Sequence, residues 1–207
     1  MSADHPSGHG ADSSSRPRGP STATVLRFAD LRPEPWRNGG GITREIAGSG
    51  SRTGNFAWRL SLADVEQPGP FSRFPGTDRI LTVTEGEGML LTMDGHEHAV
   101  QRGRPFHFSG DVAATATLPA GAIRALNVIA RRDAVRADVV VQELSDHGAH
   151  RLAPHSFGVL LSGHAIVRTD VTASELHIHD TVRGTASGTP VITGDGLLAV
   201  VSLEHRG

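Results

Sequence analysis

Short apolar stretches, interrupted about every 8 to 12 residues by Gly, Pro, Asp or Asn, run from Val25 to the end of the chain. This spacing is typical of all-β sandwiches and barrels, whose short strands are joined by tight turns. No segment carries a 3.6-residue apolar period over about a dozen residues, which an amphipathic helix of ordinary length requires. The sequence therefore predicts an all-β fold with little helix.

Two stretches of the chain are alike and indicate an internal duplication. Residues 83–95, VTEGEGMLLTMDG, predict a strand, a glycine-punctuated turn, a second strand and an Asp-Gly hairpin turn. Residues 160–170, LLSGHAIVRTD, repeat the strand, turn and strand, with Gly163 in the place of Gly86. The first pattern is typical of the middle of a small jelly-roll barrel. We therefore expect tandem cupin-like jelly-roll barrels, that is, a bicupin.

The chain divides into three parts by composition. Residues 1–22 consist largely of Ser, Gly, His, Pro and Asp and cannot bury enough apolar surface to offset the entropy of ordering, so we expect a disordered tail. We place the first cupin-like barrel at residues 23–135 and the second at residues 136–207. The second part is the shorter one, and strands from the N-terminal part of the chain would complete it.

Charge and composition exclude several classes of function. The 20 basic residues are all Arg and are outnumbered by 22 acidic ones, with no basic run of the kind that follows a phosphate backbone, so we expect no nucleic-acid partner. Without Lys there is no Schiff-base amine, and without Cys there is no thiol nucleophile, disulfide or Cys-ligated metal. No apolar run approaches the roughly 18 residues of a membrane span and no secretory signal is present. We expect a cytoplasmic protein that does not bind membranes.

Three motifs in the first half are the most specific features of the sequence. They are PWRNGGGITREI at 35–46, FAWRLSLADV at 56–65 and GPFSRFPGTDR at 69–79. Together they resemble the HutD/Ves family, and the similarity continues through residues 81–95, 105–111 and 126–129. The resemblance implies a cytoplasmic bicupin without an established catalytic activity. It also implies a role in histidine utilisation, through binding of a pathway intermediate, for the HutD branch, or in cold or stress responses for the Ves branch.

The positions that hold the metal in cupin enzymes carry no ligands here. Such enzymes use His-x-His-x(3,4)-Glu-x(6)-Gly and a later His, because imidazole and carboxylate at alternating strand positions converge on one ion. If Gly86 closes this motif, Arg79 occupies the Glu position, and Arg73 and Pro75, or Ser72 and Phe74, occupy the His positions. We therefore expect no metal and no other cofactor. A guanidinium in place of a carboxylate favours an anion instead.

We accordingly expect a small carboxylate ligand, such as urocanate or formylglutamate, at the mouth of the first barrel, and a binding protein rather than an enzyme. Arg59 and Ser61 alternate with apolar neighbours and share one strand face, which is either lumen or solvent. Each of these features also has a structural alternative. The arginines could form ion pairs at the surface, and the glycine-rich loop at residues 36–41 could serve only to pack Trp36. Asn127 could cap a backbone group instead of facing a ligand. The candidate ligand-binding residues are Trp36, Asn38, Thr43, Arg59, Ser61, Phe71, Arg73, Phe74, Arg79 and Asn127.

Two His-x-His pairs leave a different function open. His96 with His98, and His177 with His179, each place two imidazoles on one strand face, as metal sites often do. The alternative is therefore a metal-dependent cupin enzyme, an isomerase or dioxygenase, although both pairs follow the wrong hairpin for a cupin metal centre. A third interpretation is a scaffold whose exposed strands mediate docking to a regulator or a homodimer.

Overall fold

The computed structural model describes residues 25–50, 56–145, 148–169, 172–186 and 189–206. Within these residues the chain is almost entirely β-strand, and the one helical segment is the 3-10 turn η1 (Phe28–Asp30). None of the helical segments described is long and apolar enough to cross a membrane. The expected all-β fold with little helix is therefore confirmed, while the expected tail at residues 1–22 lies outside the described residues.

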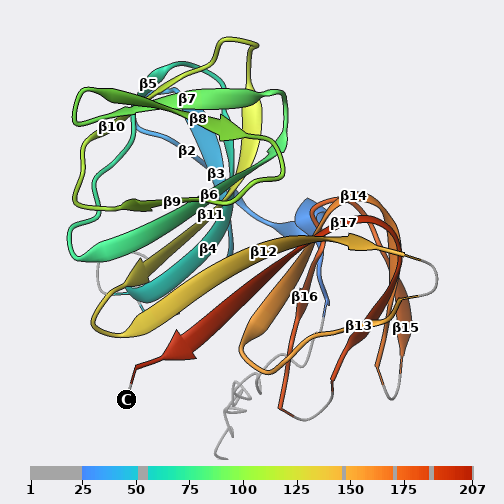
Figure 1. Cartoon of the computed structure of the whole chain (residues 1–207). Helices are drawn as coiled ribbons and strands as arrows, with labels where there is room; N and C mark the ends of the chain where they lie inside the picture. Colours follow the sequence, from blue (N-terminus) through green and yellow to red (C-terminus); the bar gives the residue numbers. More distant parts are fainter. Residues whose placement is uncertain (1–24, 51–55, 146–147, 170–171, 187–188, 207) are drawn as a thin grey trace, which may run out of the picture.

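Two sheets face each other in the first half of the molecule (Figure 1). Between them lies an apolar core that includes Leu81, Val83, Leu91 and Ala116. The six-stranded sheet has the order β2 (Pro33–Pro35), β3 (Gly41–Gly50), β4 (Phe56–Val65), β11 (Ile123–Arg131), β6 (Thr77–Glu85) and β9 (Phe106–Ser109). The four-stranded sheet has the order β5 (Gly69–Pro70), β10 (Ala114–Thr117), β7 (Gly88–Met93) and β8 (His96–Gln101).

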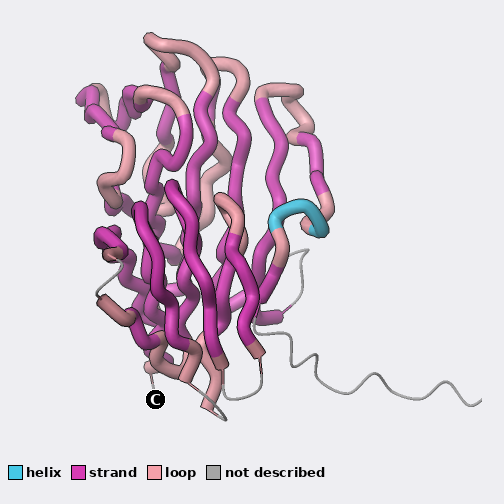
Figure 2. Tube along the Cα trace, turned by 90° about the vertical axis from the view of Figure 1, so that its right-hand side faces the viewer, coloured by secondary structure: helices cyan, strands magenta, loops and turns pink. Residues whose placement is uncertain are grey.

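A seven-stranded sheet forms the second half, and the tube view shows its long strands side by side (Figure 2). One of its faces is filled by apolar side chains, among them Leu160, Leu176 and Leu198, so this half has a solid core of its own. Its main path runs β1 (Val25–Leu26), β16 (Thr181–Arg183), β14 (Ser156–Arg168), β17 (Val191–His205) and β12 (Val135–Leu144); β13 (His150–Arg151) pairs with β17 and β15 (Ala173–Leu176) with β14.

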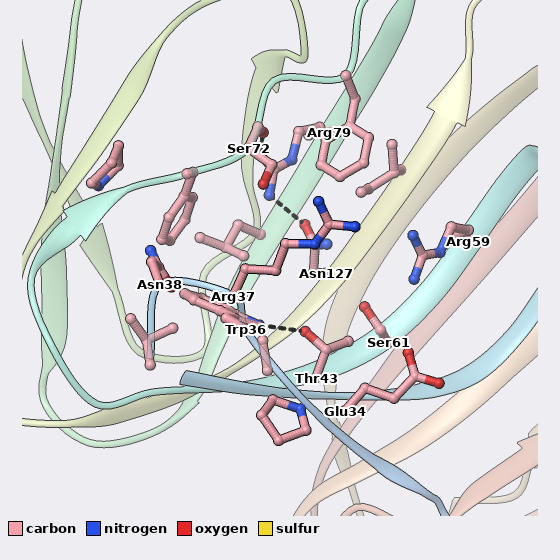
Figure 3. Close-up of a pocket in the computed structure, with 18 residues that line it drawn as sticks. Glu34, Trp36, Arg37, Asn38, Thr43, Arg59, Ser61, Ser72, Arg79 and Asn127 are labelled. Atoms are coloured by element: carbon pink, nitrogen blue, oxygen red, sulfur yellow. Dashed lines mark hydrogen bonds between the residues drawn. The ribbon is translucent and has the colours of Figure 1, made fainter. Parts of the chain in front are cut away.

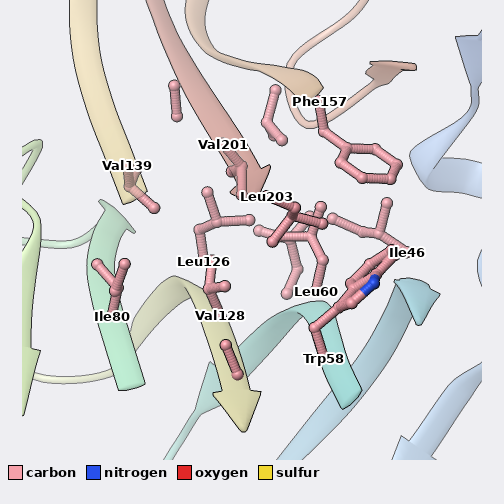
Figure 4. Close-up of a cluster of buried hydrophobic side chains, with 14 of the residues drawn as sticks. Ile46, Trp58, Leu60, Ile80, Leu126, Val128, Val139, Phe157, Val201 and Leu203 are labelled. Atoms are coloured by element: carbon pink, nitrogen blue, oxygen red, sulfur yellow. The ribbon is translucent and has the colours of Figure 1, made fainter. Parts of the chain in front are cut away.

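The largest core joins the two halves (Figure 4). Trp58 and Leu60 on β4 pack against Phe157 and Val201 of the seven-stranded sheet, and the Trp58 and Phe157 rings lie 5.5 Å apart. Successive strand residues point to opposite faces. Because Trp58 and Leu60 face this core, Arg59 and its alternate neighbours must face the interior of the first half.

A polar junction lies beside the shared core, where the chain passes from β1 in the second half to β2 in the first. β1 pairs with β16 of the second half, whereas β2 pairs with β3 of the first. The Asp180 carboxylate accepts hydrogen bonds from the Phe28 backbone N–H (2.9 Å) and from Arg27 (2.7 Å). The Phe28 ring lies beneath the guanidinium groups of Arg44 and Arg124. These contacts fix the first described residues of the chain against both halves.

None of the three sheets closes on itself as a barrel over the described residues. The division into two tandem barrels stays a prediction.

Candidate functional site

A cavity of about 570 Å³ opens into the interior of the first half (Figure 3). It is bounded by the inner face of the six-stranded sheet, by the glycine-rich segment after β2, and by the segment between β5 and β6. Nine of the ten residues that the sequence predicts to bind a ligand line it: Trp36, Asn38, Thr43, Arg59, Ser61, Phe71, Phe74, Arg79 and Asn127.

Strand register arranges the sheet side of this cavity in rows. Ile129 on β11 pairs with Arg59 on β4 and with Arg79 on β6, so two arginines flank one apolar side chain. Two residues further along, Asn127 pairs with Ser61 and Leu81 in the same way. Of the two faces that the sequence left open, lumen or solvent, Arg59 and Ser61 lie on the one that faces the interior of the first half.

Arg79 is a charged side chain buried at the cavity. Its side chain belongs to a residue only 6% exposed, and burial lowers the pKa of the guanidinium to about 10. Its Nη1 donates to the Ser72 carbonyl oxygen (3.2 Å) and its Nη2 to the Asn127 Oδ1 (3.2 Å), while its Nε has no hydrogen-bond partner. Over the described residues, no carboxylate forms an ion pair with Arg79. A buried cation held by neutral acceptors alone lacks a counter-charge, which an anion would supply.

Three aromatic rings surround the same guanidinium. The Arg79 Cζ lies 4.8 Å from the ring centre of Phe108, 5.4 Å from that of Phe74 and 5.5 Å from that of Phe71. Cation–π attraction of this kind partly compensates the lost hydration of the charge. The rings also hold the guanidinium in place and limit the access of water, which strengthens its attraction for a carboxylate.

The other two predicted arginines differ from Arg79. Arg59 forms an ion pair with Glu45 (3.2 Å) and lies over the Phe56 ring, so its charge is already balanced. Arg73 is exposed and donates from Nε and Nη2 to the carbonyl oxygen of Asp111 (2.9 and 2.6 Å). It lines a separate surface pocket rather than the cavity, so the structure does not bring it together with the other predicted residues.

The glycine-rich segment forms a fixed wall of the cavity. The Trp36 indole N–H donates to the Thr43 hydroxyl (2.7 Å), and its ring meets the Phe71 ring edge-on at 6.0 Å. The Asn38 side chain accepts from the Gly40 N–H (3.1 Å). A Cβ built on Gly41 would overlap the carbonyl oxygen of Asp64, so only glycine allows this close approach. The segment therefore both packs its Trp and lines the cavity.

Ser61 and Asn127 supply neutral polar groups next to Arg79. Ser61 is only 4% exposed, and its hydroxyl belongs to the lining of the cavity. Because Asn127 Oδ1 accepts from Arg79, its amide nitrogen remains as a donor. The two groups add donors to those of the guanidinium, as an anion requires.

Sequence reasoning missed three polar residues of the cavity, namely Glu34, Arg37 and Ser72. Arg37 and Ser72 lie outside the strands, where no alternation indicates the direction of a side chain, and Glu34 lies in β2, a strand of only three residues. A signal was available for Arg37 alone, since it follows Trp36 directly in the most specific motif of the chain.

Comparison with known proteins assigns the family. The family model described as HutD matches residues 28–200, which is most of the chain. The chain belongs to the HutD family. The expected HutD/Ves resemblance is thereby confirmed, and the match extends well beyond the first half on which the sequence motifs depended.

Two curated relatives share only part of their length with this chain. An uncharacterised 21.2 kDa protein in the hutC 3′ region of Pseudomonas putida is 46% identical over 112 residues, which are 51% of this chain and 56% of that protein. The protein Ves of Citrobacter koseri is 41% identical over 123 residues, 57% of this chain and 64% of that protein. The chain thus matches somewhat over half the length of these relatives.

Solved structures resemble the whole fold. A conserved Pseudomonas aeruginosa PAO1 protein of unknown function superposes with a TM-score of 0.77 at 31% identity, over 87% of this chain and 97% of that one. HutD from Pseudomonas fluorescens SBW25 gives a TM-score of 0.73 at 32% identity, over 88% and 98%. A cupin 2 barrel protein from Leptotrichia buccalis, at 7% identity and a TM-score of 0.59 over 88% and 97%, shows that the fold is cupin-like.

The two histidine pairs of the metal alternative lie on different elements. His96 and His98 are on β8, and the His98 ring lies near Phe106. His177 and His179 are in a turn after β15 and not on a strand face as expected; His177 is exposed, whereas His179 is buried at a φ of +71°. No group of three or more His, Asp or Glu side chains in the described ranges is arranged to hold a metal ion.

His179 has a structural role instead. Its Nε2 lies 3.1 Å from the Thr84 hydroxyl on β6, and its ring lies 5.3 Å from that of Phe28. Burial, with a contribution from the nearby Arg124 guanidinium, lowers the pKa of this imidazole to about 4. His179 is therefore neutral at pH 7 and ties the turn of the second half to the six-stranded sheet of the first.

Proposed function

We propose that this HutD-family protein binds a small organic acid in the cavity of its first half, with the carboxylate at Arg79. The observation that carries the proposal is the buried Arg79 guanidinium, which is held by neutral acceptors and aromatic rings and has no carboxylate partner in the described structure. A bound carboxylate would supply the missing counter-charge through charge-assisted hydrogen bonds.

The surroundings of Arg79 indicate what the rest of the ligand is like. The Asn127 amide and the Ser61 hydroxyl offer further hydrogen bonds to the acidic group or its substituents. Trp36, Phe71 and Leu81 provide apolar surface for a flat or unsaturated body. A cavity of about 570 Å³ suits a metabolite-sized molecule.

Membership of the HutD family gives the proposal its biological setting. We propose that the ligand is an intermediate of histidine degradation, such as urocanate or formylglutamate, and that its binding modulates histidine utilisation in the cytoplasm without metal chemistry. Assembly into a homodimer is compatible with this role. No observation in the described structure favours the metal-dependent enzyme, since none of its candidate histidines belongs there to a group of three or more possible metal ligands.

Isothermal titration calorimetry with urocanate, formylglutamate, glutamate, formate and uncharged amide analogues tests the proposal. The acids should bind, and their amides should bind much more weakly. Arg79→Ala should weaken acid binding by roughly 1.5 to 3 kcal/mol, about 10- to 150-fold, the scale of a hydrogen bond to a charged group. Arg59→Ala should cost less, because Glu45 already balances that charge.

Arg73→Ala is the matched control. It removes the same charge from the neighbouring segment but from outside the cavity, so acid affinity should stay unchanged. If no acid binds the wild-type protein, or if Arg79→Ala binds acids as tightly as the wild type, the site assignment is wrong.

A further inference from the structure

β12 ends the seven-stranded sheet, and no described strand pairs with its outer side (Figure 1). On its inner side it pairs with β17 along its whole length of ten residues, without a bulge. The strands that end the sheets elsewhere, β1, β2, β5, β8 and β9, have only two to six residues. The backbone N–H and C=O groups along the outer side of a strand this long are a template for a further strand.

β12 lacks two features that often keep an edge strand from pairing, namely proline and bulges. Its sequence, VRADVVVQEL, contains neither Pro nor Gly, whereas the short edge strands β2 and β5 contain Pro33, Pro35 and Pro70. Val140, in the middle of β12, is 52% exposed, and Ile178 is the one other large apolar side chain exposed among the described residues. Another strand laid against β12 would remove this valine from water.

The charges on β12 make its edge complementary to itself. Arg136 and Asp138 are both exposed, and strand alternation places them on one face of the sheet. When two copies of a strand pair antiparallel about a two-fold axis, each contact occurs twice. The register centred on Ala137 brings Arg136 of each copy opposite Asp138 of the other. Registers centred one residue away, on Arg136 or Asp138, place like charges opposite each other, which is destabilising.

The other residue pairs of this register are apolar. Val135 lies opposite Val139 of the other copy, on the face that packs on the core shared by the two halves. Ala134, the residue before β12, lies opposite Val140 of the other copy, so the exposed valine gains an apolar neighbour. Charge and apolar pattern therefore agree on one register.

We propose that β12 is the contact surface between two copies of this chain, which pair edge to edge and antiparallel with Ala137 at the two-fold axis. The two seven-stranded sheets then form one continuous sheet. No residue of β12 lines the cavity, so this proposal is independent of the proposed ligand. The paired stretch is short, so we expect a weak dimer with a Kd of roughly 1 to 100 µM.

Sedimentation velocity over a series of protein concentrations tests the proposal. The wild-type chain should change from monomer to dimer as its concentration rises. Arg136→Asp and Asp138→Arg should each raise the Kd about tenfold or more, because each turns two attractive pairs into two repulsive ones. The double variant Arg136→Asp/Asp138→Arg restores opposite charges and should return the Kd to within about threefold of the wild type.

Two matched controls separate the edge from general effects. Arg104→Asp makes the same change of charge at an exposed arginine outside β12 and should leave the Kd unchanged. Val140→Lys should weaken the dimer, whereas Ile178→Lys, at the other exposed apolar side chain, should not. Thermal denaturation of dilute samples checks that each variant folds, since Arg136 lies opposite Glu204 within the chain.

Hydrogen exchange detects the backbone pairing itself. The amides of β12 should exchange more slowly at protein concentrations above the Kd than below it. The proposal is wrong if the wild type stays monomeric at about ten times the upper expected Kd, if the folded double variant does not regain the dimer, or if β12 exchanges equally fast at both concentrations. If the double variant does not fold, equal Kd values for Val140→Lys and Ile178→Lys overturn the proposal.

Discussion

Replacing Asn127 with Asp would place inside the protein the negative charge that the cavity is proposed to take from its ligand. The Asn127 Oδ1 lies 3.2 Å from Arg79 Nη2, so an Asp at this position puts a carboxylate oxygen in direct contact with the guanidinium. Burial lowers the pKa of Arg79 from its usual value to about 10, which corresponds to a cost of roughly 3 kcal/mol for keeping this group charged. An internal carboxylate offsets part of this cost, and the burial of its own charge reduces the net gain.

Two measurements on Asn127→Asp follow from this magnitude. The free energy of unfolding should rise by about 1 to 3 kcal/mol, measured by urea denaturation at pH 7. The affinity for carboxylate ligands should fall by roughly 10- to 100-fold, because the guanidinium is already paired. Trp36 lines the cavity, and the chain has two Trp and no Tyr, so tryptophan fluorescence reports binding next to the site.

Asn127→Ala separates charge from the loss of the amide. It removes the acceptor of Arg79 without adding a charge, so stability should fall and carboxylate affinity should change only a few-fold. The reasoning is refuted if Asn127→Asp binds carboxylates as tightly as the wild type, or if Asn127→Ala loses as much affinity as Asn127→Asp.

Two further predictions concern the turn beside the cavity and the polar junction. Gly41→Ala should cost more than about 2 kcal/mol of stability and weaken ligand binding, because its Cβ would overlap the Asp64 carbonyl oxygen. Gly39→Ala should cost only about 1 kcal/mol, because the space there is open and only the φ of +69° opposes a side chain. Equal costs of the two variants in thermal denaturation would contradict this prediction. Burial lowers the pKa of His179 to about 4, so this imidazole takes up a proton near pH 6.5 in the unfolded chain but only near pH 4 in the folded chain. The free energy of unfolding should therefore fall by up to about 3 kcal/mol as the pH decreases from 6.5 to 4. His179→Asn, which tolerates the positive φ, should show a smaller fall, and an unchanged pH profile in urea denaturation would refute the assignment.

The part of the site that lies on strands could be predicted from the sequence, because successive side chains of a strand point to opposite faces of the sheet and only two assignments are possible. Arg59 and Ser61 share a face in any regular strand, and the sequence left open only which face that is. The answer depends on Trp58 and Leu60, which are buried against Phe157, a residue nearly a hundred positions away. No local pattern contains that information.

Loop residues were predicted less well, because their directions are set by single long-range contacts. Arg73 and Arg79 lie six residues apart in one motif, yet Arg73 turns outward to the Asp111 carbonyl and Arg79 inward to Asn127. His179 was expected on a strand and lies in a turn instead, held by Thr84 of the other half. Each of these outcomes needs a partner that sequence spacing does not identify.

The core shared by the two halves couples the parts of the chain on either side of residue 135. Residues on both sides of that point bury the same apolar surface, and Val25–Leu26, from the N-terminal side, complete the edge of the seven-stranded sheet. Neither part can unfold without exposing the interior of the other, so the protein should denature in a single cooperative transition. A ligand that occupies the cavity of the first half therefore stabilises the second half by the same free energy.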